Sequence, residues 1–496
     1  MEVPSTGDGR RGEPGRPRTL ELCRAIEVLE PVQVVSSGRP PVHELAYDAR
    51  TVEPGTLFFC VRGARSDGHA FAGEALSRGA AALVVEEVLD LPAPQLVVQD
   101  ARAAMAVVAD EFFGRPTEEL AVAGVTGTNG KTTTAYLLHS ILETAGRRPG
   151  LLGNVERRVG GVAEPSGLNT PEAIDLQRLL RRMLDAGDRS CALEASSHAS
   201  ALHRLDRVRF AVLVFTNLTQ DHLDFHGTME DYFEAKQRLF HEHDLGGAAI
   251  DVDGPYGRRL ARSLGRRAVT FGFSDEATFR PERLELDPAG TRFRVDGVEV
   301  RTHLRGRFNV ENALGAYAAA SLLGIDGATA AAGIERLGGV PGRLEPVDEG
   351  QPFTVLVDYA HTPDSLAGAL RAARELSPGR LICVFGCGGE RDRGKRPLMG
   401  RLAAEFADRA IVTSDNPRGE DPLAIVAEIL AGAAVGQLEV EPDRRAAIER
   451  AVGEAAPGDV VLIAGKGHEG GQQVGEETFP FDDRRVAREA LAQGRR

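Results

Sequence analysis

Two long stretches of this chain alternate short apolar runs with helical segments, and this alternation constrains the fold more than any other feature. The first begins near residue 117 and includes LAVAGVTG, CALEAS and AVLVFTN. The second begins after Pro341-Gly342 and includes FTVLVDYA, RLICVFG, RAIVTSD and DVVLIAG. Parallel strands need crossover helices, so each stretch predicts a mostly parallel sheet covered by helices. The predicted fold class is therefore α/β.

The chain has 496 residues, more than one hydrophobic core can hold, and we expect three domains. Residues 19–116 contain short strands around a turn-rich centre and predict a small N-terminal α/β domain. Residues 117–342 predict a central domain, and residues 343–496 predict a doubly wound, Rossmann-like domain. Residues 1–18 are rich in Gly, Pro and Arg and predict a disordered tail.

Composition excludes several classes of protein. The net charge is −14 and no basic stripe with aromatic residues occurs, so we expect no nucleic-acid partner. No apolar run is long enough to span a membrane, and the N-terminus lacks the apolar core of a secretory signal. The five cysteines are scattered, which favours reduced thiols over a disulfide framework. We expect a cytoplasmic monomer that acts on small molecules and contacts no membrane.

Lysine is rare in this chain. Of the 59 basic residues only four are lysines. Guanidinium cannot replace a compact ammonium or a reactive primary amine, so the remaining lysines are enriched for functional sites. The four are Lys131, Lys236, Lys395 and Lys466.

A glycine-rich turn joins the run LAVAGVTG to a helix predicted over residues 131–145. Its glycines let backbone N–H groups close on phosphate oxygens, and the helix N-terminus favours negative charge. Lys131 would bridge the β- and γ-phosphates of ATP, and the Thr132 hydroxyl would bind Mg²⁺. The strict P-loop pattern fails because Val125 occupies its first glycine position, so an ordinary βα turn is the alternative. The predicted ATP-binding turn consists of Gly127, Thr128, Asn129, Gly130, Lys131, Thr132 and Thr133.

Polar side chains that suit a metal follow the next two strands. Glu194 ends the run CALEAS, and His222 lies in the segment DHLDFH after AVLVFTN. Carboxylate and imidazole groups at neighbouring strand ends suit Mg²⁺ bound to phosphate oxygens, and zinc is disfavoured because no cysteine lies near. A solvated, hydrogen-bonded loop is the alternative. Lys236 follows in the helix MEDYFEAKQRLF, either as a surface lysine or, given the scarcity of lysine, as part of the site.

Three strand ends of the last domain carry charged residues, in segments 390–396, 415–418 and 465–469. Cations, an amide and carboxylates that converge there would suit a zwitterionic amino acid. Three capped surface loops are the alternative. The glycines at 386–389 do not complete a dinucleotide-binding motif, because Arg391 occupies the last glycine position.

Together these motifs resemble the Mur ligase family of peptidoglycan synthesis, from about residue 43 to residue 485. The similar motifs are YDARTVEPGTLFF, GTNGKTT, LEASSH, FTNLTQDHLDFHGTMEDYFEAK, GRFNVENALGA, VPGRLE, VDYAHTPDSL, GGERDRGKRP, DNPR, AGKGHE and PFDDR. The resemblance implies three domains that bind a UDP-sugar, ATP and an amino acid in turn. It also implies an ATP-dependent ligase that adds meso-diaminopimelate to UDP-MurNAc-L-Ala-D-Glu through an acyl phosphate, with Mg²⁺ as cofactor.

The resemblance assigns catalytic roles to residues of this sequence. Glu194 and His222 would bind Mg²⁺ together with Thr132. Lys236 would be carbamylated and would serve as a further metal ligand. Lys131 would complete the catalytic set with Glu194, His222 and Lys236.

The resemblance also assigns three binding sites. The nucleotide would be held by Asn312, Arg343 and Asp358 in addition to the glycine-rich turn. The amino acid would be bound by Arg391, Asp415, Asn416, Pro417, Arg418, Gly465 and Glu469. The UDP-muramyl peptide would be bound by Ala49, Asn169, Thr170, Ser196 and Arg204.

Arg418 predicts which amino acid binds. Meso-diaminopimelate differs from lysine by a second carboxylate at its far end, and the forked donors of Arg418 suit a carboxylate. Asp415, Asn416 and Glu469 would receive the distal ammonium. The alternative is that Arg418 caps its own loop beside Glu420.

Three positions depart from the family pattern, and all three fall in the predicted UDP-muramyl-peptide pocket. Ala49 replaces the serine of the usual YDSR, Asn169 replaces the first of two threonines, and Leu202 replaces a glutamine. A ligase of the same fold that adds L-lysine or uses a modified acceptor is therefore an alternative. A P-loop NTPase switch or binding protein is another, but it leaves the amino-acid-like site unexplained.

Overall fold

The computed structural model describes residues 19–35, 38–63, 66–287 and 290–493. The tail predicted at residues 1–18 lies outside these ranges. The chain divides into two compact units, which are described separately. The first comprises Met1–Leu120, Pro171–Asp188 and Ala201–Val208, and the second comprises Ala121–Thr170, Arg189–Ser200 and Arg209–Arg496.

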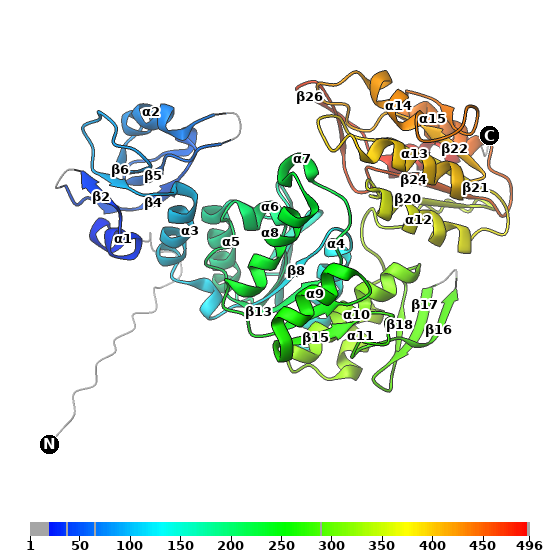
Figure 1. The fold of residues 1–496 in the computed structure, drawn as a ribbon, viewed down its shortest axis with the longest axis horizontal. Helices are drawn as coiled ribbons and strands as arrows, with labels where there is room; N and C mark the ends of the chain where they lie inside the picture. Colours follow the sequence, from blue (N-terminus) through cyan, green and yellow to red (C-terminus); the bar gives the residue numbers. More distant parts are fainter. Residues whose placement is uncertain (1–18, 36–37, 64–65, 288–289, 494–496) are drawn as a thin grey trace. The chain divides into compact units, whose positions relative to one another are not determined.

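The first unit contains a five-stranded sheet in the order β2, β7, β6, β5, β4 (Figure 1). Its strands are β2 (Gln33–Val35), β4 (Glu44–Ala46), β5 (Thr56–Phe59), β6 (Ala80–Val85) and β7 (Gln95–Val97). Strands β4 to β7 run parallel, and β2 pairs antiparallel with β7. The helices of this part are α1 (Leu22–Leu29), α2 (Ala72–Ser77) and α3 (Ala101–Phe112). A short antiparallel pair, β1 (Leu20–Glu21) and β3 (Pro41–Val42), forms a separate two-stranded sheet.

Helix α5 (Ala173–Asp185) also belongs to the first unit, although its sequence follows strands of the second. Its residues Ala173 and Ile174 are buried in the same apolar cluster as Met105 and Val108 of α3. No local sequence signal indicated that α5 belongs to the first unit. The domain boundaries at residues 116 and 342 stay a prediction.

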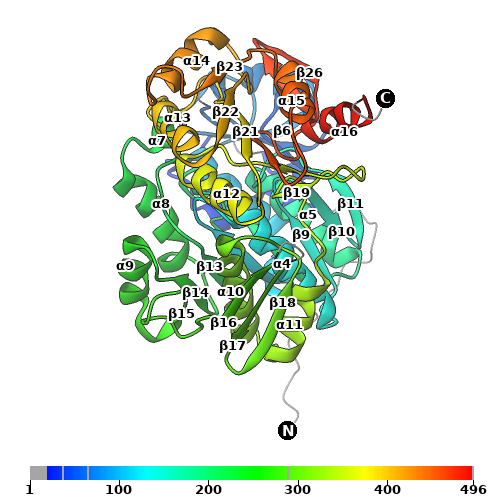
Figure 2. The same ribbon diagram turned by 90° about the vertical axis from the view of Figure 1, so that its right-hand side faces the viewer.

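The second unit contains an eight-stranded sheet in the order β11, β10, β9, β12, β8, β13, β14, β15 (Figure 2). Its strands are β8 (Ala121–Thr126), β9 (Pro149–Leu152), β10 (Glu156–Val159), β11 (Val162–Pro165), β12 (Ser190–Glu194), β13 (Phe210–Phe215), β14 (Ala248–Asp251) and β15 (Ala268–Phe271). All neighbouring strands pair parallel except at one edge, where β10 pairs antiparallel with both β9 and β11.

Helices cover this sheet because its strands are apolar on both faces. Val125, Ala192 and Val214 pack against α4 (Lys131–Thr144), α10 (Arg307–Leu322) and α11 (Gly327–Arg336). The other helices of this part are α6 (Ser197–Ala201), α7 (Leu223–His226), α8 (Met229–His241) and α9 (Pro255–Leu264). A separate antiparallel sheet of β16 (Glu282–Asp287), β17 (Gly290–Val295) and β18 (Val298–Thr302) was not predicted.

The C-terminal part of the second unit has a six-stranded sheet in the order β19, β20, β24, β21, β22, β23. Its strands are β19 (Glu345–Pro346), β20 (Thr354–Asp358), β21 (Leu381–Phe385), β22 (Arg409–Val412), β23 (Glu439–Val440) and β24 (Val460–Ala464). All are parallel except β19. A hairpin of β25 (Gly471–Val474) and β26 (Glu477–Pro480) follows.

Helices pack on both faces of the six-stranded sheet. On one face, Leu356 and Leu462 lie in a cluster with α12 (Pro363–Glu375), α13 (Lys395–Phe406) and α14 (Pro422–Leu430). On the other, Val357 and Ile463 lie in a cluster with α15 (Arg444–Gly453) and α16 (Asp483–Gln493). The predicted α/β class and the doubly wound C-terminal sheet are confirmed.

Two expectations from composition can be compared with the structure. Among the described residues, no helix has the length and apolar character needed to cross a membrane. All five cysteines carry free thiols, at Cys23, Cys60, Cys191, Cys383 and Cys387.

Candidate functional site

A cavity of about 620 Å³ lies in the second unit. Its walls come from the turn between β8 and α4, the loops after β12 and β13, helix α10, and the carboxyl ends of β20, β21, β22 and β24. Open parallel sheets bind ligands beyond the carboxyl ends of their strands. The predicted residues that line it are Thr128, Asn129, Gly130, Lys131, Thr132, Thr133, Asn169, Glu194, His222, Asn312, Arg343, Asp358, Arg391, Asp415, Asn416, Arg418, Gly465 and Glu469. The residues predicted for ATP and for the amino acid therefore share one cavity.

The glycine-rich turn is shaped by close approaches that exclude side chains. Gly127 has a φ of +150°, and a Cβ there would lie 1.9 Å from Thr216 Oγ1. Gly130 has a φ of +86°, and a Cβ there would lie 2.2 Å from Asn312 Oδ1. Only glycine fits both positions. Helix α4 begins at the next residue, as predicted, and ends at Thr144.

Lys131 curls back over this turn. Its Nζ donates to the carbonyl oxygens of Gly127 at 2.9 Å and Thr128 at 2.7 Å. Burial lowers the pKa of Lys131, and the charges of Glu194 and Asp221 offset part of this effect. Among the residues that the structure describes, the ammonium forms no ion pair within 4.0 Å, and an anionic ligand would improve its environment.

Lys236 lies directly beneath the same turn. Its side chain is 1% exposed on α8, and its Nζ donates to the Gly127 carbonyl at 2.8 Å. Burial, reinforced by the charge of Lys131, holds the pKa of Lys236 well below its usual value. The alternative of a surface lysine is therefore wrong, and a neutral, nucleophilic amine is favoured at this position.

Glu194 ends β12 and is buried. Its Oε1 accepts a hydrogen bond from the Asn154 backbone N–H at 2.8 Å. A Cβ on Gly153 would lie 2.6 Å from the same oxygen, so the chain approaches the carboxylate closely here. The Thr170 hydroxyl donates to the Glu194 backbone carbonyl at 2.7 Å, outside the cavity wall.

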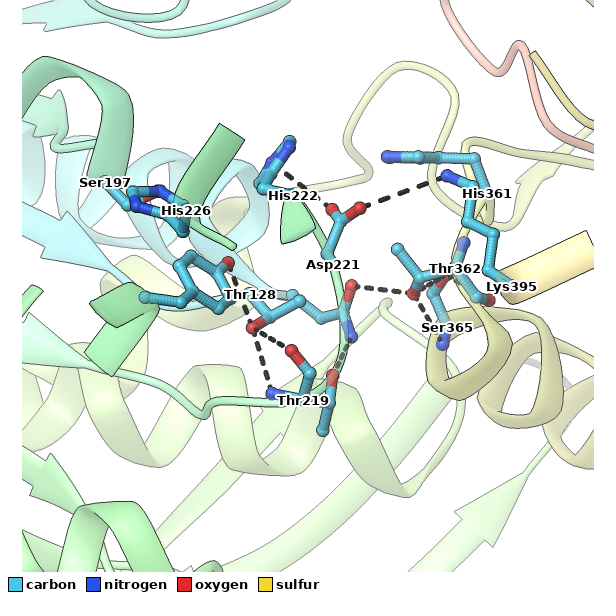
Figure 3. A network of polar contacts seen from close by, with 12 residues as sticks. Thr128, Ser197, Thr219, Asp221, His222, His226, His361, Thr362, Ser365 and Lys395 are labelled. Carbon is cyan, nitrogen blue, oxygen red and sulfur yellow. Dashed lines mark hydrogen bonds and ion pairs between the residues drawn. The ribbon is translucent and has the colours of Figure 1, made fainter. Parts of the chain in front are cut away.

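Asp221 lies between His222 and Lys395, the first residue of helix α13, as Figure 3 shows. Its carboxylate lies 3.3 Å from His222 Nε2 and 3.9 Å from Lys395 Nζ. Burial lowers the pKa of His222 against the opposing charge of Asp221, and the imidazole is neutral. Asp221 is 5% exposed, so the alternative of a solvated loop does not describe this carboxylate.

The candidate metal ligands do not form a metal cage by themselves. Within the part of the chain that the structure describes, no group of three or more His, Cys, Asp or Glu side chains is arranged to hold a metal ion. Thr132 Oγ1 accepts a hydrogen bond from Arg343 Nη2 at 3.0 Å. A hydroxyl, a carboxylate and a neutral imidazole nevertheless suit a hard cation that keeps most of its ligands as water and phosphate oxygens.

Asn129 joins the glycine-rich turn to the start of α12. Its Nδ2 donates to Asp364 at 2.9 Å, and its Oδ1 lies 3.5 Å from the Thr362 hydroxyl. Thr362 and Ser365 form the capping box that begins α12. Gln220 makes a second link of this kind, donating to Asp392 at 3.1 Å.

The other predicted nucleotide residues are held rigidly. Asp358, at the end of β20, accepts backbone N–H groups of Leu344 at 2.7 Å and Ala360 at 2.8 Å. The guanidinium of Arg343 lies 4.5 Å above the Tyr359 ring. Asn312 Nδ2 donates to its neighbour Asn309 on α10 at 2.9 Å.

The predicted amino-acid residues gather at the ends of β22 and β24. Asp415 is buried, and a Cβ on Gly465 would lie 2.5 Å from its Oδ2. Burial by itself would raise the pKa of Asp415, but the charges of Lys466 and Arg444 outweigh it and keep the carboxylate ionised. Arg444 is in turn fixed by a buried ion pair with Asp483 at 2.7 Å.

Arg418 faces the cavity from a strained backbone position. Its φ is +51°, and its Nη1 donates to the Gly389 carbonyl at 2.6 Å. Glu420, the expected partner if Arg418 capped its own loop, pairs with Arg396 at 2.9 Å instead. The alternative of a loop cap is therefore wrong, and Arg418 is available to a ligand carboxylate. Pro417 does not line the cavity.

The residues predicted for the UDP-muramyl peptide are divided between the units. Asn169, Thr170 and Ser196 belong to the second unit, and only Asn169 lines the cavity. Ala49 and Arg204 belong to the first unit, where Arg204 pairs with Glu172 at 2.7 Å.

Sequence reasoning missed several cavity residues. Arg307, Phe308 and Glu311 on α10 and Arg371 on α12 line it, although each reads as an ordinary helical residue. Asp221 lies in the segment DHLDFH that was predicted to contain a metal ligand. Its ion pair with Lys395 could not be predicted from the spacing of residues in the sequence.

The scarcity of lysine was an informative signal. Lys131 and Lys395 line the cavity, Lys236 contacts its glycine-rich turn, and Lys466 contacts two residues of its wall, at Asn416 and Glu469. All four lysines of the chain therefore converge on one site.

Comparisons with known proteins extend these findings. Three family models match consecutive parts of the chain: the Mur ligase family catalytic domain over residues 41–126, the Mur ligase middle domain over 125–320, and the Mur ligase glutamate ligase domain over 342–467.

Individual relatives match nearly the whole length. A Geobacillus thermodenitrificans protein named UDP-N-acetylmuramoyl-L-alanyl-D-glutamate–2,6-diaminopimelate ligase is 45% identical, covering 96% of this chain and 100% of that protein. A Solibacter usitatus protein of the same name is 47% identical, covering 95% and 97%. A solved structure described by this name aligns with a TM-score of 0.67 at 32% identity, covering 95% of this chain and 99% of that one. The similarity thus includes both units.

Proposed function

This chain belongs to the Mur ligase family, and from that premise we propose that it uses ATP to join meso-diaminopimelate to UDP-MurNAc-L-Ala-D-Glu in peptidoglycan synthesis. One observation supports the proposal above others: a glycine-rich nucleotide turn and a cluster of charges suited to an amino acid line the same cavity. A nucleotide switch would need only the first of these. A ligase needs both, because the activated intermediate must meet the amine.

In the first step, the γ-phosphoryl group of ATP passes to the γ-carboxylate of D-Glu. The bond from the γ-phosphorus to its bridging oxygen breaks, ADP leaves, and an acyl phosphate forms. Lys131 would exchange its carbonyl contacts for phosphate oxygens and stabilise the charge that moves. Arg343 and Asn312 would orient the nucleotide beside the turn.

Mg²⁺ fits the oxygen and neutral imidazole donors of Thr132, Glu194 and His222, and when bound it would neutralise charge on the phosphate oxygens. Lys236 would contribute as a carbamate. Its neutral amine attacks CO₂, an N–C bond forms, and a proton leaves, so that a buried lysine becomes an anionic oxygen donor. Guanidinium cannot undergo this conversion.

In the second step, the amine of diaminopimelate attacks the acyl carbon. The C–N bond forms, the C–O bond to phosphate breaks, inorganic phosphate leaves, and the amine loses a proton. Asp415, Arg418 and Glu469 would hold the distal end of the amino acid, so that its reacting amine faces the intermediate.

A panel of acceptor nucleotides against amino acids tests the reaction, scored by phosphate release and product mass. The expected result is phosphate release that depends on both the muramyl dipeptide and diaminopimelate. Phosphate release from ATP alone at the same rate would support an NTPase switch instead. Ala49, Asn169 and Leu202 depart from the family pattern, so the main alternative is a ligase that uses a modified acceptor. Comparing the acceptor nucleotides of the panel distinguishes the two.

A cytoplasmic, monomeric enzyme with small-molecule substrates and no nucleic-acid partner is part of the proposal. Sedimentation equilibrium of the purified chain measures the oligomeric state, and a stable dimer would contradict it.

Arg418→Ala is expected to remove the preference for diaminopimelate over lysine. A charge-assisted hydrogen bond contributes roughly 1.5–3 kcal/mol, so kcat/KM for diaminopimelate should fall by about tenfold to a hundredfold. Lysine lacks the distal carboxylate and should be affected much less. The measurement is kcat/KM for both amino acids in the parent and in the variant.

Arg393→Ala is the matched control, because Arg393 is an exposed arginine of the same domain that pairs with Glu428 and does not line the cavity. It should leave both values unchanged. Two results would contradict the assignment of diaminopimelate to Arg418. One is a parent enzyme that prefers lysine, and the other is an Arg418→Ala variant in which kcat/KM falls equally for both amino acids.

A further inference from the structure

Lys466 lies behind the wall of the amino-acid end of the cavity. It follows Gly465 at the end of β24, and its side chain is 0% exposed. It does not line the cavity but contacts two residues that do. Its Nζ lies 2.9 Å from Asn416 Oδ1 and 3.0 Å from Glu469 Oε2.

These contacts determine which way the Asn416 amide points. Asn416 Oδ1 accepts from Lys466 Nζ and also from the Gln473 backbone N–H at 3.0 Å. Both partners are donors, so the atom that faces them must be the amide oxygen. Asn416 Nδ2 consequently points toward Glu469, to which it donates at 2.9 Å. A flipped amide would set its N–H groups against two other donors.

The orientation decides what Asn416 offers a ligand. A carbonyl oxygen has two lone pairs, and both are engaged by Lys466 and Gln473. The amide nitrogen has two hydrogens, and Glu469 takes one. Asn416 therefore presents a donor to the cavity, which suits a carboxylate. This differs from the sequence expectation that Asn416 receives an ammonium.

We propose that Lys466 is a positioning residue that sets the polarity of the amino-acid pocket, by holding Asn416 as a donor beside Arg418. One side of the pocket, formed by Arg418 and Asn416, then binds a carboxylate. The other side, formed by Asp415 and Glu469, binds an ammonium. A substrate with both groups at its distal end fits this division, and lysine fills only half of it. The inference rests on the proposed function, in which diaminopimelate occupies this pocket.

Lys466→Met tests the proposal, because methionine keeps an unbranched side chain only one heavy atom shorter and removes the donor. Without Lys466 the Asn416 amide can turn and present its oxygen, which repels a carboxylate and accepts an ammonium. The ratio of kcat/KM for diaminopimelate to that for lysine is expected to fall by about tenfold or more. KM for ATP should not change. A general loss of structure would change it, so this measurement separates a local effect from misfolding.

Asn416→Asp provides a second arm that leaves Lys466 in place. It replaces the donating NH₂ by an oxygen of the same size, and we expect the same loss of preference for diaminopimelate. If Lys466 acts through Asn416, the double variant should lose little more selectivity than either single variant. Full additivity of the two effects would show that Lys466 acts by another route.

Arg409→Met is the control for the loss of an ion pair in the same domain. Arg409 pairs with Glu439 at 2.6 Å at the start of β22, at the opposite end of the strand from the site. It should change the melting temperature but not the selectivity ratio.

The outcomes separate the inference from the function on which it rests. A parent enzyme that prefers lysine overturns the proposed function and the inference together. A parent that prefers diaminopimelate, with Lys466→Met and Asn416→Asp variants that keep this preference, overturns the inference alone. If Lys466→Met fails to fold, the ratio measured for Asn416→Asp decides.

Discussion

Lys131→Ala is expected to lower kcat for ligation by about a hundredfold to a thousandfold or more while the protein remains folded. The ammonium lies at the start of α4, where the turn and the helix N-terminus favour phosphate, and it is the cation that the nucleotide meets there. Burial already lowers the pKa of Lys131, so its charge is unfavourable without a ligand. Its removal should therefore not lower the melting temperature. Phosphate release and thermal unfolding of the variant measure the two effects.

Arg336→Ala is the matched control for this variant. Arg336 forms a surface ion pair with Glu143 of the same helix α4, at 3.2 Å, and should leave kcat unchanged. If Lys131→Ala keeps near-normal turnover, phosphoryl transfer does not occur at this turn. Loss of turnover accompanied by unfolding would show that Lys131 holds the turn together rather than stabilising the transferring group.

The parallel sheets of the fold were predictable because they depend on local pattern. Each buried strand reads as a continuous apolar run, and the helix that follows has its own start signal, as Gly130 provides for α4. The sheet of β16 to β18 was missed because its strands alternate. In β17, exposed Arg292 and Arg294 alternate with buried Thr291, Phe293 and Val295, which is the pattern of a strand with one exposed face rather than of a continuous apolar run.

The sequence predicted many of the residues that line the cavity, but it did not predict their mutual contacts. Asp221 meets Lys395, and Asn416 meets Lys466, across 174 and 50 positions of the chain, and no spacing rule links them. Composition supplied the signal that local motifs lacked. In a chain that uses arginine almost everywhere, a retained lysine marks a place where a small donor or an amine is needed.

The orientation of a buried amide is decided by partners that sequence cannot identify. Asn416 was expected, together with Asp415 and Glu469, to receive the distal ammonium of the amino acid. In the structure, Lys466 Nζ and the Gln473 backbone N–H donate to its oxygen. Under the proposal above, Asn416 therefore offers a ligand a donor rather than an acceptor. Residue identity therefore predicted the site, and the hydrogen-bond network determined its polarity.

Lys236→Arg is expected to reduce ligation to below about one per cent of the parent rate, although arginine is the nearest basic side chain in size. A lost anionic oxygen donor at a phosphoryl-transfer site costs several kcal/mol, and each 1.4 kcal/mol is about tenfold. The structure favours the reaction that makes this donor. Lys236 is buried, its amine donates to the Gly127 carbonyl, and burial together with the charge of nearby Lys131 lowers its pKa. Arginine places a permanent cation there and cannot add CO₂. The measurement combines turnover with ¹³C NMR of the protein in ¹³C-bicarbonate, where a carbamate signal should occur in the parent only.

Lys236→Ala separates the loss of a carbamate from the loss of a cation. The shortened side chain leaves room for a small carboxylate from solution, and added formate or acetate should restore part of the activity to Lys236→Ala but none to Lys236→Arg. Arg238→Lys on the same helix is the control, because Arg238 pairs with Glu242 and the Ser200 carbonyl, does not line the cavity, and keeps its charge in the exchange. Full activity in Lys236→Arg would show that a cation is sufficient beneath the turn. The carbamate would then have no role, and Lys236 would act only through its hydrogen bond to Gly127.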